Sequence, residues 1–528
     1  MAHSTRLIPV TLAAAIAMAT LALAAPDAGA DDSGKKNGRF TAGAAGVGDV
    51  YYPLAGNGGY DVSHYDIAGR YEPATDVWSA TTTIHARATA DLYRFNLDFD
   101  GMVISSLSVD GKKAGWRREG AELVVVPQHK IKSGAPLTVI ATYSGVPKEF
   151  VLPAGDSELR TGFMATDDGA TVAGQPDVAA GWFPVNDHPR DKATYTFHVT
   201  VPEGLGVVAN GFLESQQTAG GWTTFVWDAQ EAMASYLATI DIGDWDVREW
   251  TTDSGLPVYD AVDPDLLADP EFGESINSSL ARQGEIVDVL SDAFGPYPFS
   301  TVGAIIDDQD DLIFALETQT RPVYSKYFWP DGDGVVAHEL AHQWYGDHVA
   351  LEQWQDIWLN EGWATYAEWI WAEHEGFFTP QDAFDFFYAE IPEDDPFWSF
   401  VIGQPPADDL FGGPVYLRGG MTLQALRNRV GDEAFFDIAR SWVSERGGGT
   451  GTTAQFIELS ERVSGQQLDD LFDAWLFTDS KPTITTIAAG AADRGAVSGA
   501  ARTAAADSTR AVERWSAAVE KRLAHGRY

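Results

Sequence analysis

The chain contains no cysteine. This absence excludes disulfide bonds, thiolate zinc sites and cysteine nucleophiles. Basic residues are also scarce, because 35 Lys and Arg stand against 77 Asp and Glu, which gives a formal net charge of −42. Such a surface repels the phosphate backbone that nucleic-acid-binding proteins must neutralise. We therefore expect no nucleic-acid partner.

Long hydrophobic runs are lacking except at the start, where Leu7 to Ala25 is almost entirely apolar. The small residues Ala28-Gly29-Ala30 follow, a pattern typical of a secretory signal peptide over residues 1–30 with cleavage after Ala30. An uncleaved membrane anchor is the alternative, since a run of this length can just span a bilayer. Pro9 and the small-residue exit favour cleavage. The expected protein is secreted and has no stable membrane insertion.

Composition changes along the chain predict a multidomain α+β protein. Residues 31–50 are Gly-rich and predict a flexible leader. Residues 51–245 hold short alternating segments such as Thr81–Ala86, Leu123–Val126 and Thr194–Val199, which indicate an N-terminal β domain. Helical periodicity dominates most of residues 246–480. Residues 481–528 form an Ala-rich tail.

Some local boundaries can also be predicted. Amphipathic helix should end at Phe294, because Gly295-Pro296 cannot continue it. Two strand-like runs follow, Val302–Ile306 and Leu312–Ala315. In the tail, Val512, Trp515, Val519 and Leu523 fall on one helical stripe. That stripe predicts a short docking helix, with a frayed tail as the alternative.

The segment Val335 to Trp344 contains His338-Glu339-Leu340-Ala341-His342. Histidines at i and i+4 lie on the same side of a helix and can share one metal ion. Two imidazoles and one carboxylate leave a fourth zinc position for the water that hydrolysis requires. Eighteen residues separate His342 from Glu361, which lies at the start of a second helical stretch. We expect it to be the third ligand, rather than a solvated carboxylate at a helix start.

This arrangement predicts a zinc-activated water with Glu339 as the general base. Zinc lowers the pKa of bound water to about 7, and a glutamate can then accept its proton and return one to the leaving nitrogen. A second donor is needed for the charge that develops on the substrate oxygen, and spacing does not identify it. One zinc ion per chain is expected.

These motifs resemble the M1 family of zinc aminopeptidases, the gluzincins that include aminopeptidase N and leukotriene A4 hydrolase. The resemblance rests on His338 to Trp344 with Asn360-Glu361-Gly362 and on three further segments in the same order. Those segments are Gly181 to Pro189 with Lys192-Ala193, Gly295-Pro296-Tyr297-Pro298-Phe299, and Tyr416-Leu417-Arg418-Gly419-Gly420. The resemblance implies a β-sheet saddle domain followed by a thermolysin-like, mainly helical catalytic domain. Larger members add a helical C-terminal domain, so the resemblance predicts a more open site here.

The resemblance also implies further site residues. Tyr416 takes the place of the catalytic tyrosine that donates to the oxyanion, whereas a buried core tyrosine is the alternative. Glu317 takes the place of the glutamate that binds the substrate's α-ammonium in the family's Gly-Ala-Met-Glu-Asn motif. This chain keeps only the alanine and the acid, in Ala315-Leu316-Glu317-Thr318. Gln175 takes the place of a glutamine that also contacts the amine.

The sequence therefore predicts a secreted zinc metallopeptidase that removes N-terminal residues from peptides with a free N-terminus. A metallo-endopeptidase on the same site is the first alternative, because the motif around Glu317 is altered. A non-catalytic zinc-bearing binding protein is the second. The presence of His338, Glu339, His342, Glu361 and Tyr416 together argues against it.

Overall fold

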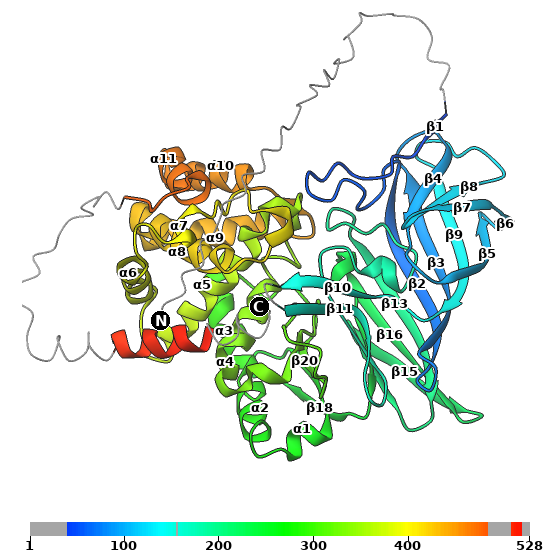
Figure 1. The fold of residues 1–528 in the computed structure, drawn as a ribbon, viewed down its shortest axis with the longest axis horizontal. Helices are drawn as coiled ribbons and strands as arrows, with labels where there is room; N and C mark the ends of the chain where they lie inside the picture. The colour runs from blue at the N-terminus through cyan, green and yellow to red at the C-terminus, as the bar shows by residue number, and fades with distance from the viewer. Residues whose placement is uncertain (1–39, 155–156, 484–507, 520–528) are drawn as a thin grey trace, which may run out of the picture. The chain divides into compact units, whose positions relative to one another are not determined.

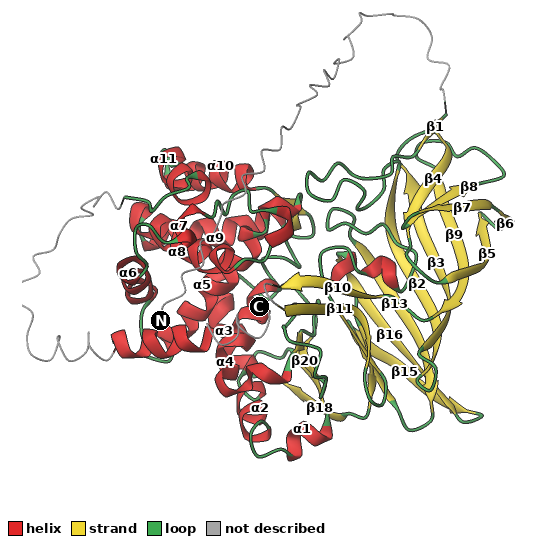
Figure 2. Cartoon of the chain, viewed as in Figure 1, coloured by secondary structure: helices red, strands yellow, loops and turns green. Residues whose placement is uncertain are grey.

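The computed structural model describes residues 40–154, 157–483 and 508–519. The expected signal peptide lies outside these residues, as does Leu523 of the tail stripe. Figure 1 shows the course of the chain, and Figure 2 shows that strands predominate in the first half of the described residues and helices in the second. None of the helices in the described ranges is long and apolar enough to cross a membrane.

The N-terminal half is built from three sheets, which confirms the predicted β domain. The largest sheet has the strand order β15-β16-β13-β2-β3-β9-β5-β6. Its strands are β2 (Tyr60–Glu72), β3 (Val77–Ala88), β5 (Val103–Val109), β6 (Lys112–Lys113), β9 (Pro136–Gly145), β13 (Ala193–Pro202), β15 (Phe212–Ala219) and β16 (Trp222–Met233). Burial alternates along β13 from residue to residue, so one face of this sheet packs on the core.

Two smaller sheets complete this half. One has the order β1-β4-β8-β7 and the other β10-β11-β12-β17-β14. Their strands are β1 (Thr41–Ala42), β4 (Leu92–Asp98), β7 (Gly115–Glu119), β8 (Glu122–Val126), β10 (Glu149–Ala154), β11 (Ser157–Ala165), β12 (Ala170–Ala173), β14 (Gly206–Ala209) and β17 (Ile240–Gly243). The three segments expected to be strands lie in β3, β8 and β13.

The second half combines a small sheet with many helices. The sheet has the order β18-β19-β20-β21, made of β18 (Asp246–Thr251), β19 (Pro257–Val262), β20 (Val302–Ile306) and β21 (Val323–Tyr324), and β22 (Ala350–Leu351) pairs with β23 (Thr450–Gly451). The helices are α1 (Pro264–Ala268), α2 (Gly273–Leu280), α3 (Gln283–Phe294), α4 (Gly332–His342), α5 (Trp358–His374), α6 (Pro380–Glu390), α7 (Pro396–Ser399), α8 (Gly413–Val430), α9 (Asp432–Arg446), α10 (Thr453–Ser464) and α11 (Asp469–Phe472). Residues 508–519 form a further helix.

Most local predictions in this half are met, and one fails. The run Val302–Ile306 forms β20, as expected. Helix α3 ends at Phe294, and Gly295 follows with a φ of 100° that suits glycine. The run Leu312–Ala315 was expected to be a strand and is not one. Val323–Tyr324 pairs with β20 instead, and Leu316, the residue after the run, pairs with Val323 in an isolated bridge.

Residues 40–50, the second part of the predicted flexible leader, are held on the folded body, contrary to that expectation. The carboxylate of Asp49 is fully buried and accepts hydrogen bonds from the backbone N–H groups of Tyr51, Tyr52 and Trp354. It also lies 3.2 Å from Nε2 of His188. These contacts hold the segment on the folded body, because a buried carboxylate needs its hydrogen-bond partners in place.

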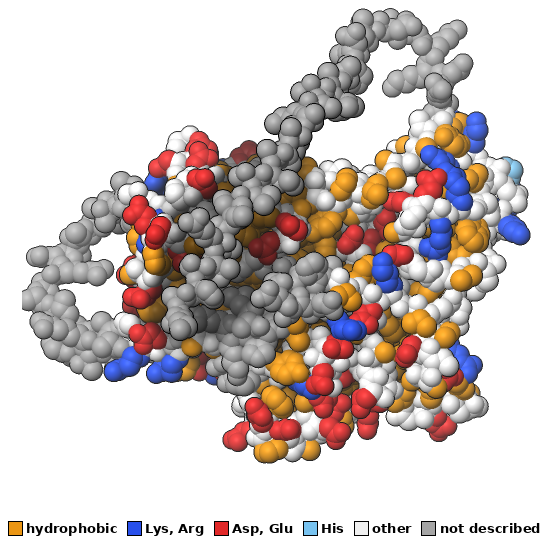
Figure 3. Space-filling model, viewed as in Figure 1, with side chains coloured by type: hydrophobic (Ala, Val, Ile, Leu, Met, Phe, Trp, Pro, Cys, Tyr) orange, Lys and Arg blue, Asp and Glu red, His pale blue; other side chains and the backbone are white. Residues whose placement is uncertain are grey.

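Acidic side chains are spread over the surface, as the net charge predicts. Figure 3 shows them gathered over the end of the molecule that carries α1 and α2, where Asp265, Glu271 and Glu274 are exposed.

Candidate active site

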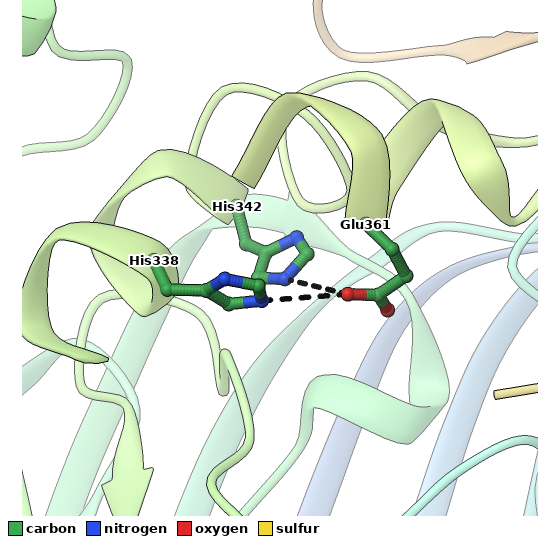
Figure 4. A group of neighbouring side chains, drawn as sticks. All are labelled: His338, His342 and Glu361. Atoms are coloured by element: carbon green, nitrogen blue, oxygen red, sulfur yellow. Dashed lines mark ion pairs between the residues drawn. The ribbon is translucent and has the colours of Figure 1, made fainter. Parts of the chain in front are cut away.

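His338 and His342 lie on one face of α4, as their spacing predicts. Glu361 lies in the first turn of α5, and its side chain points toward both imidazoles (Figure 4). Oε2 of Glu361 is 3.5 Å from Nε2 of His338 and 3.3 Å from Nε2 of His342. All three side chains are buried, so the arrangement is held by the packing of α4 against α5.

The orientation of each imidazole is fixed by its other ring nitrogen. Nδ1 of His338 is 2.8 Å from Oε1 of Glu368, which lies on α5, and Nδ1 of His342 is 3.1 Å from the carbonyl oxygen of Tyr345. Both partners are acceptors, so the proton is assigned to Nδ1 in each ring. The Nε2 lone pairs are then directed toward Glu361, as metal-binding histidines require.

These residues fit a zinc ion. With zinc–ligand distances of about 2.0 to 2.1 Å, two ligand atoms at a tetrahedral angle are about 3.3 to 3.4 Å apart. The two distances from Glu361 Oε2 to the imidazoles are close to this value. One ligand atom from each of the three residues lies within 4.8 Å of the others. Two imidazoles and one carboxylate are a donor set that catalytic zinc sites use.

The charges in the site also suit a cation. Burial would raise the pKa of Glu361, but the neighbouring His342 and His338 lower it to about 2. Glu361 is therefore a carboxylate at neutral pH. Burial would lower the pKa of His342, whereas Glu361 and Glu317 raise it well above its usual value. These carboxylates favour positive charge at this position.

Glu339 lies between the two histidines in sequence and is almost completely buried. Burial raises the pKa of Glu339 to about 8. Glu317 and Glu361 add to this rise, and His338 and His342 oppose it. Within the described part of the chain, the Oε1 atom of Glu339 has no hydrogen-bond partner. A buried carboxylate oxygen of this kind is suited to accept a proton from a small molecule in the site.

Tyr416 is brought to the same place by α8. Its ring stacks on that of His338, with ring centroids 6.0 Å apart and an angle of 26° between the planes. Helix α8 approaches α5 closely because two glycines face each other, and a Cβ atom on Gly419 would lie 2.8 Å from the Cα atom of Gly362. The sequence motif that contains Tyr416 thus also sets the spacing of the two helices.

Arg418 from the same motif has a structural role. Its buried guanidinium donates hydrogen bonds to backbone carbonyls on the segments that flank α8, namely those of Trp398, Phe400, Ala474, Trp475 and Thr478. A planar guanidinium with five N–H donors can satisfy several carbonyls at once. It therefore fixes the start of α8, and with it Tyr416.

Glu317 lies in the buried segment before β21, and the N-terminal half of the chain contacts it directly. Oε1 of Glu317 accepts a hydrogen bond of 3.0 Å from the hydroxyl of Tyr236. One ligand atom each of Glu317, Glu339 and His342 lies within 4.8 Å of the others. Burial raises the pKa of Glu317, an effect that His342 opposes.

Gln343, which follows the second zinc-ligand histidine, holds this segment in place. Its Nε2 donates to the carbonyl of Glu317 at 3.1 Å, and its Oε1 accepts from the backbone N–H of Thr320 at 2.8 Å. The zinc helix and the segment that carries Glu317 are therefore joined by one amide side chain.

Gln175 lies in the loop after β12 and is partly buried. It precedes a cis peptide bond to Pro176. In the described ranges, its Oε1 atom is buried without a hydrogen-bond partner. None of the hydrogen bonds among the described residues joins Gln175 to Glu317, whereas Tyr236 donates one to that carboxylate.

Two further motifs of the resemblance position the site from outside. Nζ of Lys192 donates to the carbonyls of Asp347 and His348, in the turn after α4, at 2.6 and 3.0 Å. Nε1 of Trp344 donates to the carbonyl of Gly295 at 2.9 Å. Both contacts join the turn after the zinc helix to distant segments.

Sequence reasoning missed Glu368, Tyr236 and Gln343. Glu368 follows Glu361 by seven residues on α5, which is two helical turns, so its place on the metal-facing side could have been found from that spacing. Gln343 lies inside the quoted motif and was not assigned a role. Tyr236 is 81 residues from Glu317, and no local pattern connects them.

The fold and the arrangement of His338, His342 and Glu361 are those expected of a zinc-dependent metallopeptidase. The chain belongs to peptidase family M1. The sequence model of the Peptidase M1 N-terminal domain matches residues 62–237, and that of the Peptidase family M1 domain matches residues 331–475. The predicted resemblance is confirmed.

Solved structures agree with this assignment. An M1 zinc metallopeptidase from Deinococcus radiodurans is 28% identical, with a TM-score of 0.73 over 83% of this chain and 99% of that one. A mutant of that enzyme bound to a Tyr-Ser-Ala substrate is 27% identical, with a TM-score of 0.73 over 83% of this chain and 100% of that one.

Curated relatives are much longer. The glutamyl aminopeptidase of Sus scrofa is 26% identical over 57% of this chain and 34% of its own length. The glutamyl aminopeptidase of Homo sapiens is 24% identical over 57% of this chain and 33% of its own length. The chain thus spans about a third of the length of the curated relatives it matches.

Proposed function

We propose that this protein is a secreted aminopeptidase that binds one zinc ion and releases N-terminal residues from peptides with a free α-amine. The observation that carries this proposal is the position of the Glu317 carboxylate. It is buried beside Glu339 and His342, with one ligand atom of each residue within 4.8 Å of the others.

The spacing suits an exopeptidase. In a peptide's first residue the α-nitrogen and the carbonyl carbon are about 2.5 Å apart, because they are joined through one Cα atom. An ammonium group that is hydrogen-bonded to Glu317 therefore keeps the first carbonyl next to the zinc-ligand residues. Carboxylate-to-ammonium hydrogen bonds in a buried site are charge-assisted and contribute about 1.5 to 3 kcal/mol.

Each side chain around the metal position has a separate role in peptide hydrolysis. When bound, zinc would polarise the substrate carbonyl and make a water molecule more acidic. Glu339 would take the proton of the attacking water and return it to the leaving nitrogen. The hydroxyl of Tyr416 would donate a hydrogen bond to the negative charge that develops on the carbonyl oxygen.

Names of relatives support peptide substrates. The matched Deinococcus radiodurans structure was solved with a Tyr-Ser-Ala substrate, and the curated relatives above are aminopeptidases by name. Secretion is supported by the apolar run from Leu7 to Ala25 and the small residues up to Ala30. The acidic surface suits a soluble extracellular enzyme.

The test is hydrolysis of amino-acid anilides and of matched peptides with free and N-acetylated termini, with and without a zinc chelator. We expect the purified protein to cleave only the free-amine substrates, and zinc to restore the activity that the chelator removes. Equal cleavage of acetylated peptides would identify an endopeptidase, the alternative that the altered motif around Glu317 permits. Zinc binding without cleavage of either set would identify a binding protein.

A further inference from the structure

The helix formed by residues 508–519 packs on the catalytic half of the protein. Val512 is completely buried, and Ala511 and Ala518 are nearly so. The indole of Trp515 makes edge contacts with aromatic rings on and after α5 and on α6. Its ring centroid is 6.1 Å from that of Trp369, 6.1 Å from that of Phe378 and 5.8 Å from that of Phe387. The helix is therefore held by an aromatic cluster and not by a single contact.

The same indole reaches the back of the zinc site. Nε1 of Trp515 donates a hydrogen bond of 3.0 Å to Oε2 of Glu368. The other oxygen of that carboxylate, Oε1, lies 2.8 Å from Nδ1 of His338. Glu368 is almost completely buried, so each oxygen is oriented by a protein donor. A residue far along the chain is thus two hydrogen bonds from a zinc-ligand histidine.

We propose that Trp515 is a positioning residue of the zinc site, and that the helix of residues 508–519 is a functional part of the catalytic half. The carboxylate behind a metal-binding histidine fixes the ring's orientation and raises its affinity for the metal. A carboxylate with one oxygen bonded to His338 can still rotate about its side-chain bonds. The N–H group of Trp515 restricts that rotation by holding the second oxygen.

The inference rests on the zinc site of the proposed function but not on its substrate. Its readout is therefore the affinity for zinc alone, measured by competition with a chromogenic chelator at fixed pH. Failure of the aminopeptidase assay would leave this measurement intact, and an unchanged zinc affinity would leave the aminopeptidase proposal intact.

Trp515→Phe is the test variant, because it keeps an aromatic ring and removes the N–H donor. Loss of a partner behind a metal ligand commonly lowers metal affinity about 10- to 100-fold. Because Trp515 is one contact further from the metal, we expect a loss of about 3- to 10-fold. Unchanged zinc affinity would overturn the proposal.

Trp369→Phe is the matched control. Trp369 is buried in the same aromatic cluster and contacts Trp515, but within the described residues its Nε1 atom has no hydrogen-bond partner. Both variants remove the same atoms from the cluster, so both should lower the melting temperature of the zinc-free protein. Only Trp515→Phe should weaken zinc binding by more than about twofold. Equal losses in the two variants would show a general packing effect and overturn the proposal.

A double-mutant cycle with Glu368→Gln tests the route. A glutamine amide cannot accept from both His338 and Trp515, because one of its two polar atoms is a donor. Adding Trp515→Phe to Glu368→Gln should therefore change zinc affinity less than about twofold, so the two effects are not additive. Fully additive losses would show that Trp515 does not act through Glu368.

Discussion

The ring of Tyr416 stacks on the imidazole of His338, with centroids 6.0 Å apart and planes at 26°. This contact places the tyrosine beside a zinc-ligand residue even though the two lie on different helices, α8 and α4. The hydroxyl of Tyr416 is the group that the proposed mechanism uses as a donor to the substrate oxygen.

Tyr416→Phe should lower kcat about 10²- to 10³-fold, the usual cost of removing one oxyanion donor. KM and zinc content should change little, because the ring and its stacking are kept. Steady-state kinetics on an amino-acid anilide and metal analysis of the purified variant check this. A variant with normal kcat would return Tyr416 to the role of a core residue.

Glu339→Gln should lower kcat about 10²- to 10⁴-fold, because the amide cannot take a proton from water. The zinc content should remain that of the unchanged protein, since Glu339 is not one of the three ligand residues in Figure 4. His338→Ala is the contrasting variant, in which zinc should be lost together with activity. Turnover by Glu339→Gln at the normal rate would disprove its role as general base.

Glu317→Gln should lower kcat/KM for free-amine substrates by about 10- to 100-fold, which corresponds to one charge-assisted hydrogen bond. The glutamine can still accept the hydrogen bond from Tyr236, so the fold should be kept. Tyr236→Phe is the control, since it removes that hydrogen bond and leaves the carboxylate charge. A larger loss in Tyr236→Phe than in Glu317→Gln would argue against Glu317 as the amine anchor.

The cluster of His338, His342 and Glu361 could be predicted from sequence because part of its placement depends on a short helical spacing. His338 and His342 are four residues apart on α4, and Glu361 lies at the start of α5, the next α-helix. The seven-residue spacing places Glu368 on the same side of α5 as Glu361, but its contact with His338 depends on how α5 crosses α4, which that spacing does not specify. The hydrogen bond from Trp515 to Glu368 depends in addition on where the helix of residues 508–519 packs. The apolar stripe in the tail predicted a helix, but it did not indicate the surface on which that helix packs.

The strand prediction for Leu312–Ala315 failed for a physical reason. β20 pairs with β19 on one side and with Val323–Tyr324 on the other. At the outer edge of this sheet, Val323 pairs with Leu316, the residue after the run, in an isolated bridge. The buried run instead anchors the next segment, because the carbonyl of Leu312 accepts a hydrogen bond from the hydroxyl of Ser325. Local alternation of side chains contains no information about which edge of a sheet is free.

Gly419→Ala should destabilise the protein and lower its kcat. An alanine in a helix interior usually stabilises relative to glycine, by about 1 kcal/mol. Here the added Cβ would lie 2.8 Å from the Cα of Gly362, so α8 must move away from α5 at a cost of about 1 to 3 kcal/mol. The shift would displace Tyr416, one turn earlier on α8. Thermal unfolding and kcat measure both effects.

Gly115→Ala is the control for this substitution. Gly115 is exposed on β7, and a Cβ there would meet only atoms of Val126 at 3.8 Å, an ordinary contact. We expect little change in stability and none in kcat. Stabilisation by Gly419→Ala would contradict the close helix contact.

Stability should fall as pH rises from about 5 to 8, and Asp241 should contribute to this fall. Asp241 lies on β17 and is completely buried. Burial raises its pKa from 3.8 to about 7, although hydrogen bonds from Thr239 and Thr171 oppose the rise. Between these two values the folded protein keeps a proton that the unfolded chain releases, so the free energy of unfolding decreases with increasing pH. The contribution is fully present below pH 3.8 and is lost as pH rises through about 7.

Asp241→Asn removes this titration and leaves a side chain of the same shape. At pH 8 the variant should therefore unfold at a higher temperature than the unchanged protein. Its free energy of unfolding should be larger by an amount on the order of 1 to 4 kcal/mol. At pH 5 the difference should be smaller, because only the part of the contribution that is lost between pH 3.8 and pH 5 is missing there. Asp288→Asn, at an exposed position on α3, is the control and should change neither value. Equal effects of Asp241→Asn at pH 5 and pH 8 would mean that the buried carboxylate does not titrate in this range, since only a change of its charge can make the effect depend on pH.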